Sequence, residues 1–129
     1  MARWLVDGMN VIGSTPDGWW RDRPGAMRRL AGQLAAWAAE TGEPVTLVLD
    51  GERVALGEHP GVDAVFAAER GERGRDAADR VIAALAAAAQ DPSELVAVTS
   101  DATLAKQLQA LGIRVQGARE FAGNPATKE

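Results

Sequence analysis

The sequence predicts a single α/β domain of three layers (α/β/α), in which a five-stranded, mainly parallel sheet lies between helices. Three observations favour this fold. Five short apolar runs are mostly continuous rather than alternating, as in strands that are covered on both faces. Alanine-rich segments with helical spacing of their apolar residues separate most of these runs. The chain has 129 residues, 47% of them hydrophobic, which suits one domain with one core.

The predicted elements alternate along the chain in the order β-α-β-β-α-β-α-β. Right-handed crossovers between parallel strands then place helices on both faces of the sheet. Strands are expected at Arg3–Asp7, Val45–Asp50, Ala64–Ala67, Leu95–Ser100 and Ile113–Val115.

Three long helices are expected between these strands. In Pro24–Thr41, apolar residues recur every three or four positions, a proline suits the first turn, and Gly42 suits the C-terminal stop. The second helix, Ala77–Gln90, ends before an Asp-Pro pair. The third, Ala102–Leu111, ends before a glycine.

The remaining segments are connections and a tail. Residues 1–122 are expected to form the domain, and residues 123–129 a polar, frayed C-terminal tail. The connection at residues 13–23 is long for a strand-to-helix loop, and such loops often carry function. Residues 69–75 are charged and glycine-rich and are expected to be mobile. Neither a signal peptide nor a membrane span is expected, so the predicted location is the cytoplasm.

The residue types that are missing exclude several kinds of site. Without cysteine, the chain has no disulfide, no thiolate nucleophile and no cysteine-based zinc or iron–sulfur site. With one histidine, it cannot form the two-histidine metalloprotease motif. The net charge of −4 argues against wrapping of nucleic acid by the whole surface, although a local basic face stays compatible with it.

Aspartates occur where the predicted strands end. Asp7 ends the first strand, Asp50 ends the second, and Asp101 follows the fourth. Asp76 and Asp79 lie three residues apart at the start of the second long helix, and so on one of its faces. Because open parallel sheets bind ligands at the carboxyl ends of their strands, we expect four or five of these side chains to converge at that edge.

Clustered carboxylates are unfavourable unless a cation compensates their charge. Mg²⁺ and Mn²⁺ prefer carboxylate oxygens, and such sites hydrolyse phosphodiesters with an activated water. The sequence therefore predicts a divalent-metal site with Asp7, Asp79 and Asp101 as the first candidate ligands, then Asp76, then Asp50. A structural interpretation stays open: Asp76 and Asp101 would cap helices, and Asp50 would only form a turn with the following glycine.

Four short motifs occur in order along almost the whole chain. They are Asp7-Gly8-Met9-Asn10-Val11-Ile12, Arg75-Asp76-Ala77-Ala78-Asp79, Val98-Thr99-Ser100-Asp101 and Gly117-Ala118-Arg119-Glu120-Phe121. Together they resemble NYN domains of the YacP-like branch, in the PIN-like nuclease superfamily. The resemblance implies the strand order 3-2-1-4-5 and a metal-dependent ribonuclease. It implies that Asp7, Asp79 and Asp101 are catalytic carboxylates at Mg²⁺ or Mn²⁺, and that Asn10 orients an acidic residue or reaches the substrate.

Basic residues beside tryptophans predict a surface for single-stranded RNA, which binds by stacking and phosphate contacts. The first candidate group is Trp19, Trp20, Arg21, Arg23, Arg28 and Arg29. The second is Arg70, Arg73, Arg75 and Arg80, with Arg119 as a further candidate; of these, Arg75 and Arg119 are the expected RNA contacts. Two alternatives stay open: the tryptophans pin the long loop to the core, and the second group is a charged loop balanced by Glu69 and Glu72.

Other functions fit the sequence less well. A haloacid dehalogenase phosphatase needs an aspartate where Met9 stands, and a receiver domain needs an acidic neighbour of Asp7 and a late lysine. A dinucleotide-binding domain needs a GxGxxG motif, which residues 8–13 lack. The main alternative to a ribonuclease is a non-catalytic RNA-binding or regulatory module on the same fold. The sequence indicates no membrane partner and leaves a homo-oligomer open.

Overall fold

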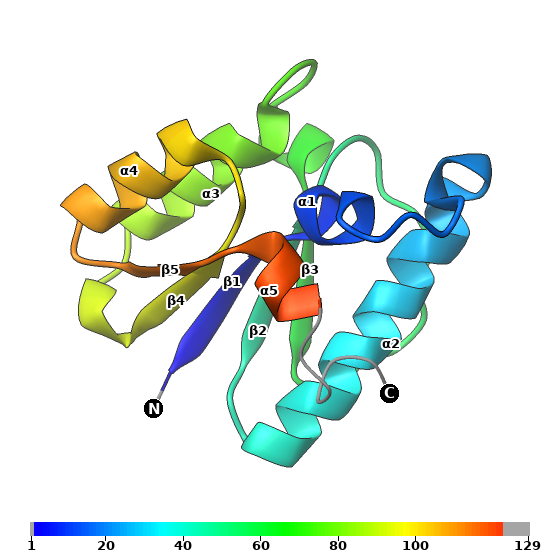
Figure 1. Ribbon diagram of the computed structural model, residues 1–129, viewed down its shortest axis with the longest axis horizontal. Helices are drawn as coiled ribbons and strands as arrows, with labels where there is room; N and C mark the ends of the chain where they lie inside the picture. Colours follow the sequence, from blue (N-terminus) through cyan, green and yellow to red (C-terminus); the bar gives the residue numbers. More distant parts are fainter. Residues whose placement is uncertain (1, 123–129) are drawn as a thin grey trace.

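The computed structural model describes residues 2–122, which form one sheet with helices on both of its faces (Figure 1). The five strands run parallel to their neighbours in the order β3-β2-β1-β4-β5. They are β1 (Arg3–Asp7), β2 (Val45–Leu49), β3 (Val62–Phe66), β4 (Leu95–Val98) and β5 (Arg114–Gln116). The predicted fold class and strand order are therefore confirmed.

The central strand β1 consists of residues that can be buried on both faces. Leu5 and Val6 are almost fully buried, and Val6 is aligned with Leu47 of β2 on one side and with Val98 of β4 on the other. Full burial of one such side chain stabilises the fold by roughly 1.5–3 kcal/mol. Because all strands are parallel, their carboxyl ends meet at one edge of the sheet, next to α1 in Figure 1.

The sheet is covered by five helices of very different length among the described residues. They are α1 (Gly8–Gly13), α2 (Arg23–Thr41), α3 (Ala77–Ala87), α4 (Ala102–Ala110) and α5 (Ala118–Ala122), with 3-10 turns η1 (Trp19–Arg21), η2 (Ala67–Arg70) and η3 (Pro92–Glu94). The Asp22 side chain caps α2 by accepting a hydrogen bond of 3.0 Å from the Gly25 backbone N–H. The helix ends at Gly42, whose positive φ of 73° suits glycine.

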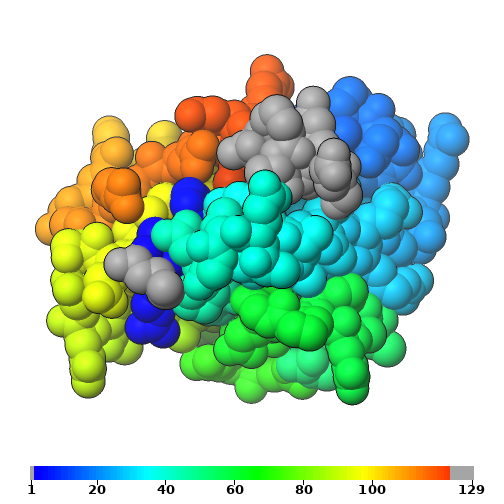
Figure 2. Space-filling view, turned by 90° about the horizontal axis from the view of Figure 1, so that it is seen from below, coloured from blue at the N-terminus to red at the C-terminus, as the bar shows by residue number. Residues whose placement is uncertain are grey.

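Two apolar cores lie on the two faces of the sheet. The first contains Trp37 of α2 and Phe121 of α5, whose rings pack edge to face with centroids 5.3 Å apart. The second contains Ile82 of α3 and Leu108 of α4. Figure 2 shows the molecule from below, at the amino ends of the strands, where the end of α2 and the start of β1 lie. This edge is opposite to the carboxyl ends.

Several predicted bounds are wrong by a few residues. The second and fourth strands end at Leu49 and Val98, before the predicted Asp50 and Ser100. The third strand is Val62–Phe66 rather than Ala64–Ala67, and the fifth is Arg114–Gln116 rather than Ile113–Val115. The helices that begin at Ala77 and Ala102 end at Ala87 and Ala110, before the predicted Gln90 and Leu111. Pairing decides these strand limits more than apolarity does. The five residues of β3, for example, are those aligned with the five of β2.

Two short helices, α1 and α5, were not expected from the sequence. Helices of five or six residues are unstable on their own, so contacts with the rest of the fold must stabilise them. Residues 123–129, the expected polar tail, lie outside the described residues. Within residues 2–122, no helix is long and apolar enough to cross a membrane.

Candidate metal centre at the carboxyl edge of the sheet

Asp7 is the last residue of β1 and is only 2% exposed. The chain turns directly from it into α1, and Gly8 makes this turn possible. A Cβ at Gly8 would lie 2.5 Å from Leu49 Cδ2 and 3.0 Å from the Val48 carbonyl oxygen, too close for any other residue without movement. The glycine therefore lets α1 lie against β2, directly beside the Asp7 carboxyl.

Gly8→Ala is expected to lower the free energy of unfolding by about 1–3 kcal/mol, because an extra methyl group overpacks this site. Denaturant unfolding measures the change. Gly13→Ala, at the other end of α1, is the matched control, since a Cβ there would have its nearest neighbour, Trp19 Cζ2, at 4.0 Å. Equal stability of the two variants would contradict the close packing of α1.

Two side chains donate hydrogen bonds to the same oxygen of Asp7. Asn10 Nδ2 lies 2.9 Å and Thr99 Oγ1 lies 3.1 Å from Asp7 Oδ2. Thr99 is also buried, and it directly follows β4, which neighbours β1. Sequence reasoning assigned Asn10 to the site but missed Thr99 as a site residue. The sequence feature that could have identified Thr99 is its place as a polar residue at the end of a buried strand, close to Asp101.

The same side chains extend the network to the loop before α4. Asn10 Oδ1 accepts a hydrogen bond of 3.1 Å from the Ser100 backbone N–H, and Thr99 Oγ1 accepts one of 3.1 Å from the Asp101 backbone N–H. The Ser100 hydroxyl oxygen accepts a bond of 2.9 Å from the Ala118 backbone N–H at the start of α5. The Asp7 carboxyl is thus the point where α1 and the β4–α4 connection meet.

Two of the other aspartates bind helix N-termini. Asp101 Oδ1 accepts a hydrogen bond of 2.8 Å from the Leu104 backbone N–H, so the capping interpretation is correct for Asp101. It is wrong for Asp76, whose side chain makes no capping bond and whose backbone has a positive φ of 61°. Asp50 caps α3 instead, by accepting a bond of 3.0 Å from the Ala78 backbone N–H.

Charge–charge effects link Asp7 with Asp79 and Asp50, and link Asp79 with Asp101, Asp76 and Asp50. Burial, and then the charge of Asp79, raise the pKa of Asp7 from its ordinary value of 3.8 to about 7, against the opposing hydrogen bonds from Thr99 and Asn10. Burial, and then the charges of Asp101, Asp76 and Asp50, raise the pKa of Asp79. These effects connect Asp79 with each of the other four aspartates, and the assignment of all five to one site stays a prediction.

The aspartates in the described part of the chain do not form a complete set of ligands around one metal ion. Within residues 2–122, no group of three or more acidic or histidine side chains is placed to bind one ion together. Part of the reason is that Asp50 and Asp101 each direct one oxygen to a helix N-terminus. Proteins usually bind Mg²⁺ through one or two carboxylates, with waters and substrate phosphates as the other ligands. Asp7 and the half-buried Asp79, whose charges act on each other, are the candidates for such a pair.

The first predicted RNA surface consists of two tryptophan–arginine pairs and two exposed arginines of α2. Arg21 lies over the Trp20 ring and Arg23 over the Trp19 ring, each with 6.0 Å to the ring centroid. Trp20 is 58% exposed, whereas Trp19 is half-buried against the first core. The pinning interpretation thus fits Trp19, and Trp20 offers an open aromatic face. Arg28 and Arg29 are both exposed on α2.

Two arginines of the second predicted surface are engaged by the chain's own acidic groups. Arg73 pairs with Glu52, and Arg80 pairs with Glu72 and also donates to two backbone carbonyls. The predicted balance by Glu72 is correct, while Glu69 pairs with Arg53 instead. The exposed candidates without an ion pair in the described part of the chain are Arg70, Arg75 and Arg119.

The chain is similar to one known protein family and to solved structures of one of its members. The profile of the YacP-like NYN domain matches residues 4–128. A solved structure of a mutant form of Rae1 (YacP) from Bacillus subtilis is 28% identical, with a TM-score of 0.74 over 94% of this chain and 72% of the other. A second structure of the same protein is 27% identical, with a TM-score of 0.74 over 94% and 71%. No curated protein matches this chain significantly.

Proposed function

The chain belongs to the YacP-like NYN domain family, of the PIN-like nuclease superfamily, and on this premise we propose that it is a metal-dependent endoribonuclease. It hydrolyses phosphodiester bonds of single-stranded RNA at the acidic edge of the sheet. The observation that carries the proposal is the buried Asp7 carboxyl at the end of β1, to which Asn10 and Thr99 donate hydrogen bonds; burial and Asp79 raise its pKa to about 7. Carboxyl groups with such raised pKa values concentrate at functional sites.

The donor set suits Mg²⁺ or Mn²⁺, because it consists of carboxylate oxygens alone. Asp7 and Asp79 would hold the ion, and Asp101, Asp76 and Asp50 would bind it or its waters from the same edge. When bound, the cation supplies a water of lowered pKa and stabilises the charge that develops on the phosphate. It also offsets the repulsion between Asp7 and Asp79.

The chain's own side chains hold the acidic groups in place. Asn10 and Thr99 orient the Asp7 carboxyl through its Oδ2, and both bonds favour the ionised form. Thr99 also fixes the backbone of Asp101, so the residues that follow β1 and β4 keep one relative position. We assign catalysis to Asp7, Asn10, Asp79 and Asp101, and the positioning of Asp7 to Thr99.

The test of the activity is cleavage of a labelled single-stranded RNA with Mn²⁺, with Mg²⁺ and with a chelator. Internal cuts are expected with either metal and none with the chelator. Binding of the RNA without cleavage under either metal would replace this proposal with the non-catalytic RNA-binding module.

The arginines beside the tryptophans are proposed to bind the RNA backbone. The double variant Arg21→Gln/Arg23→Gln is expected to weaken binding and to reduce the slope of log affinity against log salt concentration by about 1–1.5. Each contact to single-stranded nucleic acid contributes about 0.7 to this slope. Fluorescence anisotropy of a labelled RNA at several salt concentrations measures both effects.

The matched control removes the same charge from the opposite edge of the sheet. Arg3 and Arg114 are exposed first residues of β1 and β5, and so lie at the amino ends of these parallel strands. Arg3→Gln/Arg114→Gln is expected to leave the slope nearly unchanged. The same slope in both double variants would remove the η1–α2 surface from the proposal and favour Arg70, Arg75 and Arg119.

A further inference from the structure

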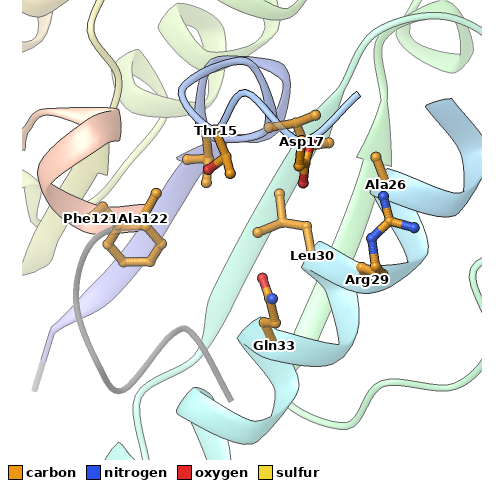
Figure 3. Close-up of a pocket in the computed structure, with 10 residues that line it drawn as sticks. Thr15, Asp17, Ala26, Arg29, Leu30, Gln33, Phe121 and Ala122 are labelled. Atoms are coloured by element: carbon orange, nitrogen blue, oxygen red, sulfur yellow. The ribbon is translucent and has the colours of Figure 1, made fainter. Parts of the chain in front are cut away.

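A cavity of about 180 Å³ lies between α1, α2 and α5, on the sheet face opposite to α3 and α4 (Figure 3). Its apolar lining includes Ile12 of α1, Leu30 of α2 and the Phe121 ring of α5. Polar side chains complete it: Thr15, Asp17, Arg29 and Gln33. Figure 3 shows Asp17 pointing into the cavity from the loop after α1, and Gln33 pointing into it from α2. A cavity that combines apolar side chains with a few polar groups is typical of a binding site.

The size of the cavity suits one flat aromatic ring system. A dry cavity of about 150 Å³ in another protein binds benzene. The cavity of about 180 Å³ therefore accommodates one nucleobase. Its lining also suits a base, since the ring faces need apolar contacts and the ring edge needs hydrogen-bonding partners.

The polar groups distinguish between the bases. The Asp17 carboxylate only accepts hydrogen bonds, and the Arg29 guanidinium only donates them. Guanine carries two adjacent donors, N1–H and the N2 amino group, that match a carboxylate. It also carries two acceptors, O6 and N7, that match a guanidinium. Adenine, cytosine and uracil lack the adjacent pair of donors.

The cavity lies next to both the acidic site and the predicted RNA surface. The helix α1 carries Asn10, which binds Asp7, and also Val11 and Ile12, which line the cavity. The helix α1 thus contributes to both sites. Arg29 belongs to α2, which begins directly after the Trp19–Arg21 turn. An RNA strand with its phosphate at the acidic site can place a nearby base here.

We propose that this cavity is a subsite for one unstacked base of the RNA, with guanine preferred. The proposal rests on the proposed ribonuclease function and adds a sequence preference to it. Asp17 binds N1–H and the N2 amino group, and Arg29 binds O6 and N7. Gln33 and Thr15 bind the remaining edge of the base or its ribose.

Binding of heptameric RNA tests this subsite, measured by fluorescence anisotropy without divalent metal so that nothing is cut. The probes are oligouridines with one central guanine, adenine or inosine. A bidentate contact discriminates by about 1–3 kcal/mol, so wild-type protein is expected to bind the guanine probe at least about fivefold more tightly than the adenine probe. Inosine, which lacks the N2 amino group, is expected to bind with intermediate affinity.

Asp17→Asn is the informative variant. The Asn Oδ1 can still accept the hydrogen bond of 3.2 Å that Asp17 Oδ1 accepts from the Trp19 backbone N–H, so the loop is retained. The amide places a donor where guanine also has donors, and the preference for guanine is expected to fall below about twofold. Glu40→Gln, an exposed carboxylate-to-amide change near the far end of α2, is the control and is expected to keep the preference.

The possible results distinguish failure of the subsite proposal from failure of the ribonuclease proposal. Equal wild-type affinity for the guanine and adenine probes, or a preference that Asp17→Asn leaves intact, overturns the subsite. Absence of Mn²⁺-dependent cleavage alongside an Asp17-dependent guanine preference overturns only the ribonuclease. Titration of free guanosine and adenosine against the amide NMR signals gives an independent measurement. Larger shifts with guanosine, centred on residues 15–33, support the subsite, and equal or absent shifts overturn it.

Discussion

Asp7→Asn is expected to lower the rate of metal-dependent RNA cleavage by at least about 100-fold, and to stabilise the metal-free protein. Loss of an outer-shell partner of a metal ligand already costs about 10- to 100-fold in activity, and loss of a ligand should cost at least as much. The amide cannot carry the negative charge that the metal ion requires. Cleavage of labelled RNA with Mn²⁺ measures the first effect.

The stabilisation follows from the burial of Asp7. At neutral pH and above, the native state holds an ionised carboxyl whose pKa has been raised from 3.8 to about 7, chiefly by burial and then by Asp79. This shift corresponds to about 4 kcal/mol of unfavourable free energy, which a neutral amide avoids. Asn10 and Thr99 both donate to Oδ2, so an amide oxygen in that position keeps both hydrogen bonds. The free energy of unfolding at pH 8 is therefore expected to rise by up to about 4 kcal/mol.

A matched control makes the same chemical change outside the site. Asp63 is an exposed residue of β3, and Asp63→Asn is expected to alter neither cleavage nor stability appreciably. A large loss of stability in metal-free Asp7→Asn would contradict the proposal, because it would show that the charge of Asp7 serves the fold. Full cleavage activity in Asp7→Asn would remove Asp7 from the catalytic site.

The stability of the metal-free wild-type protein is expected to fall as the pH rises from about 4 to about 7, and then to level off. The pKa of Asp7 is 3.8 ordinarily and about 7 in the native state, so between these values the native state holds a proton that the unfolded chain has released. Stability therefore decreases with pH across this window, and the raised pKa of Asp79 acts in the same direction. Below about pH 4 and above about pH 7, Asp7 contributes no further change.

Metal binding is expected to show the opposite dependence on pH. A divalent cation must displace the proton of Asp7, so its affinity rises by about tenfold per pH unit up to about pH 7. Denaturant unfolding and Mn²⁺ titration between pH 5 and pH 8 measure the two dependences, and Asp7→Asn isolates the contribution of this carboxyl. The same stability profile in wild type and Asp7→Asn would show that Asp7 titrates at an ordinary pKa.

The fold was predictable because its main elements are encoded locally. The buried residues of β1 and the periodic apolar face of α2 appear as patterns in short windows, and both elements form close to where they were expected. The helices α1 and α5 left no such pattern. Each is too short to be stable alone, and the close packing at Gly8 or the hydrogen bond from the Ala118 N–H to Ser100 Oγ holds it in place.

The candidate site was predictable to the level of its acidic residues. Parallel strands bring their carboxyl ends to one edge, so aspartates at strand ends were expected at that edge once the sheet was parallel. The sequence could not predict which hydrogen bonds each of these side chains makes. The bond from Thr99 to Asp7 joins residues 92 positions apart, and the bond from Ala78 to Asp50 joins residues 28 positions apart.

The sequence by itself therefore determined the sheet, the long helices and the positions of Asp7, Asp50 and Asp101 at or directly after strand ends. Only the tertiary structure decided that Asp7 is buried and has a raised pKa, that Asp50 rather than Asp76 caps α3, and that Arg73 and Arg80 are engaged by glutamates. The physical reason is the range of the interactions. Backbone propensity and hydrophobic periodicity act between near neighbours in the chain, whereas burial, charge–charge repulsion and side-chain hydrogen bonds depend on distances that exist only after folding.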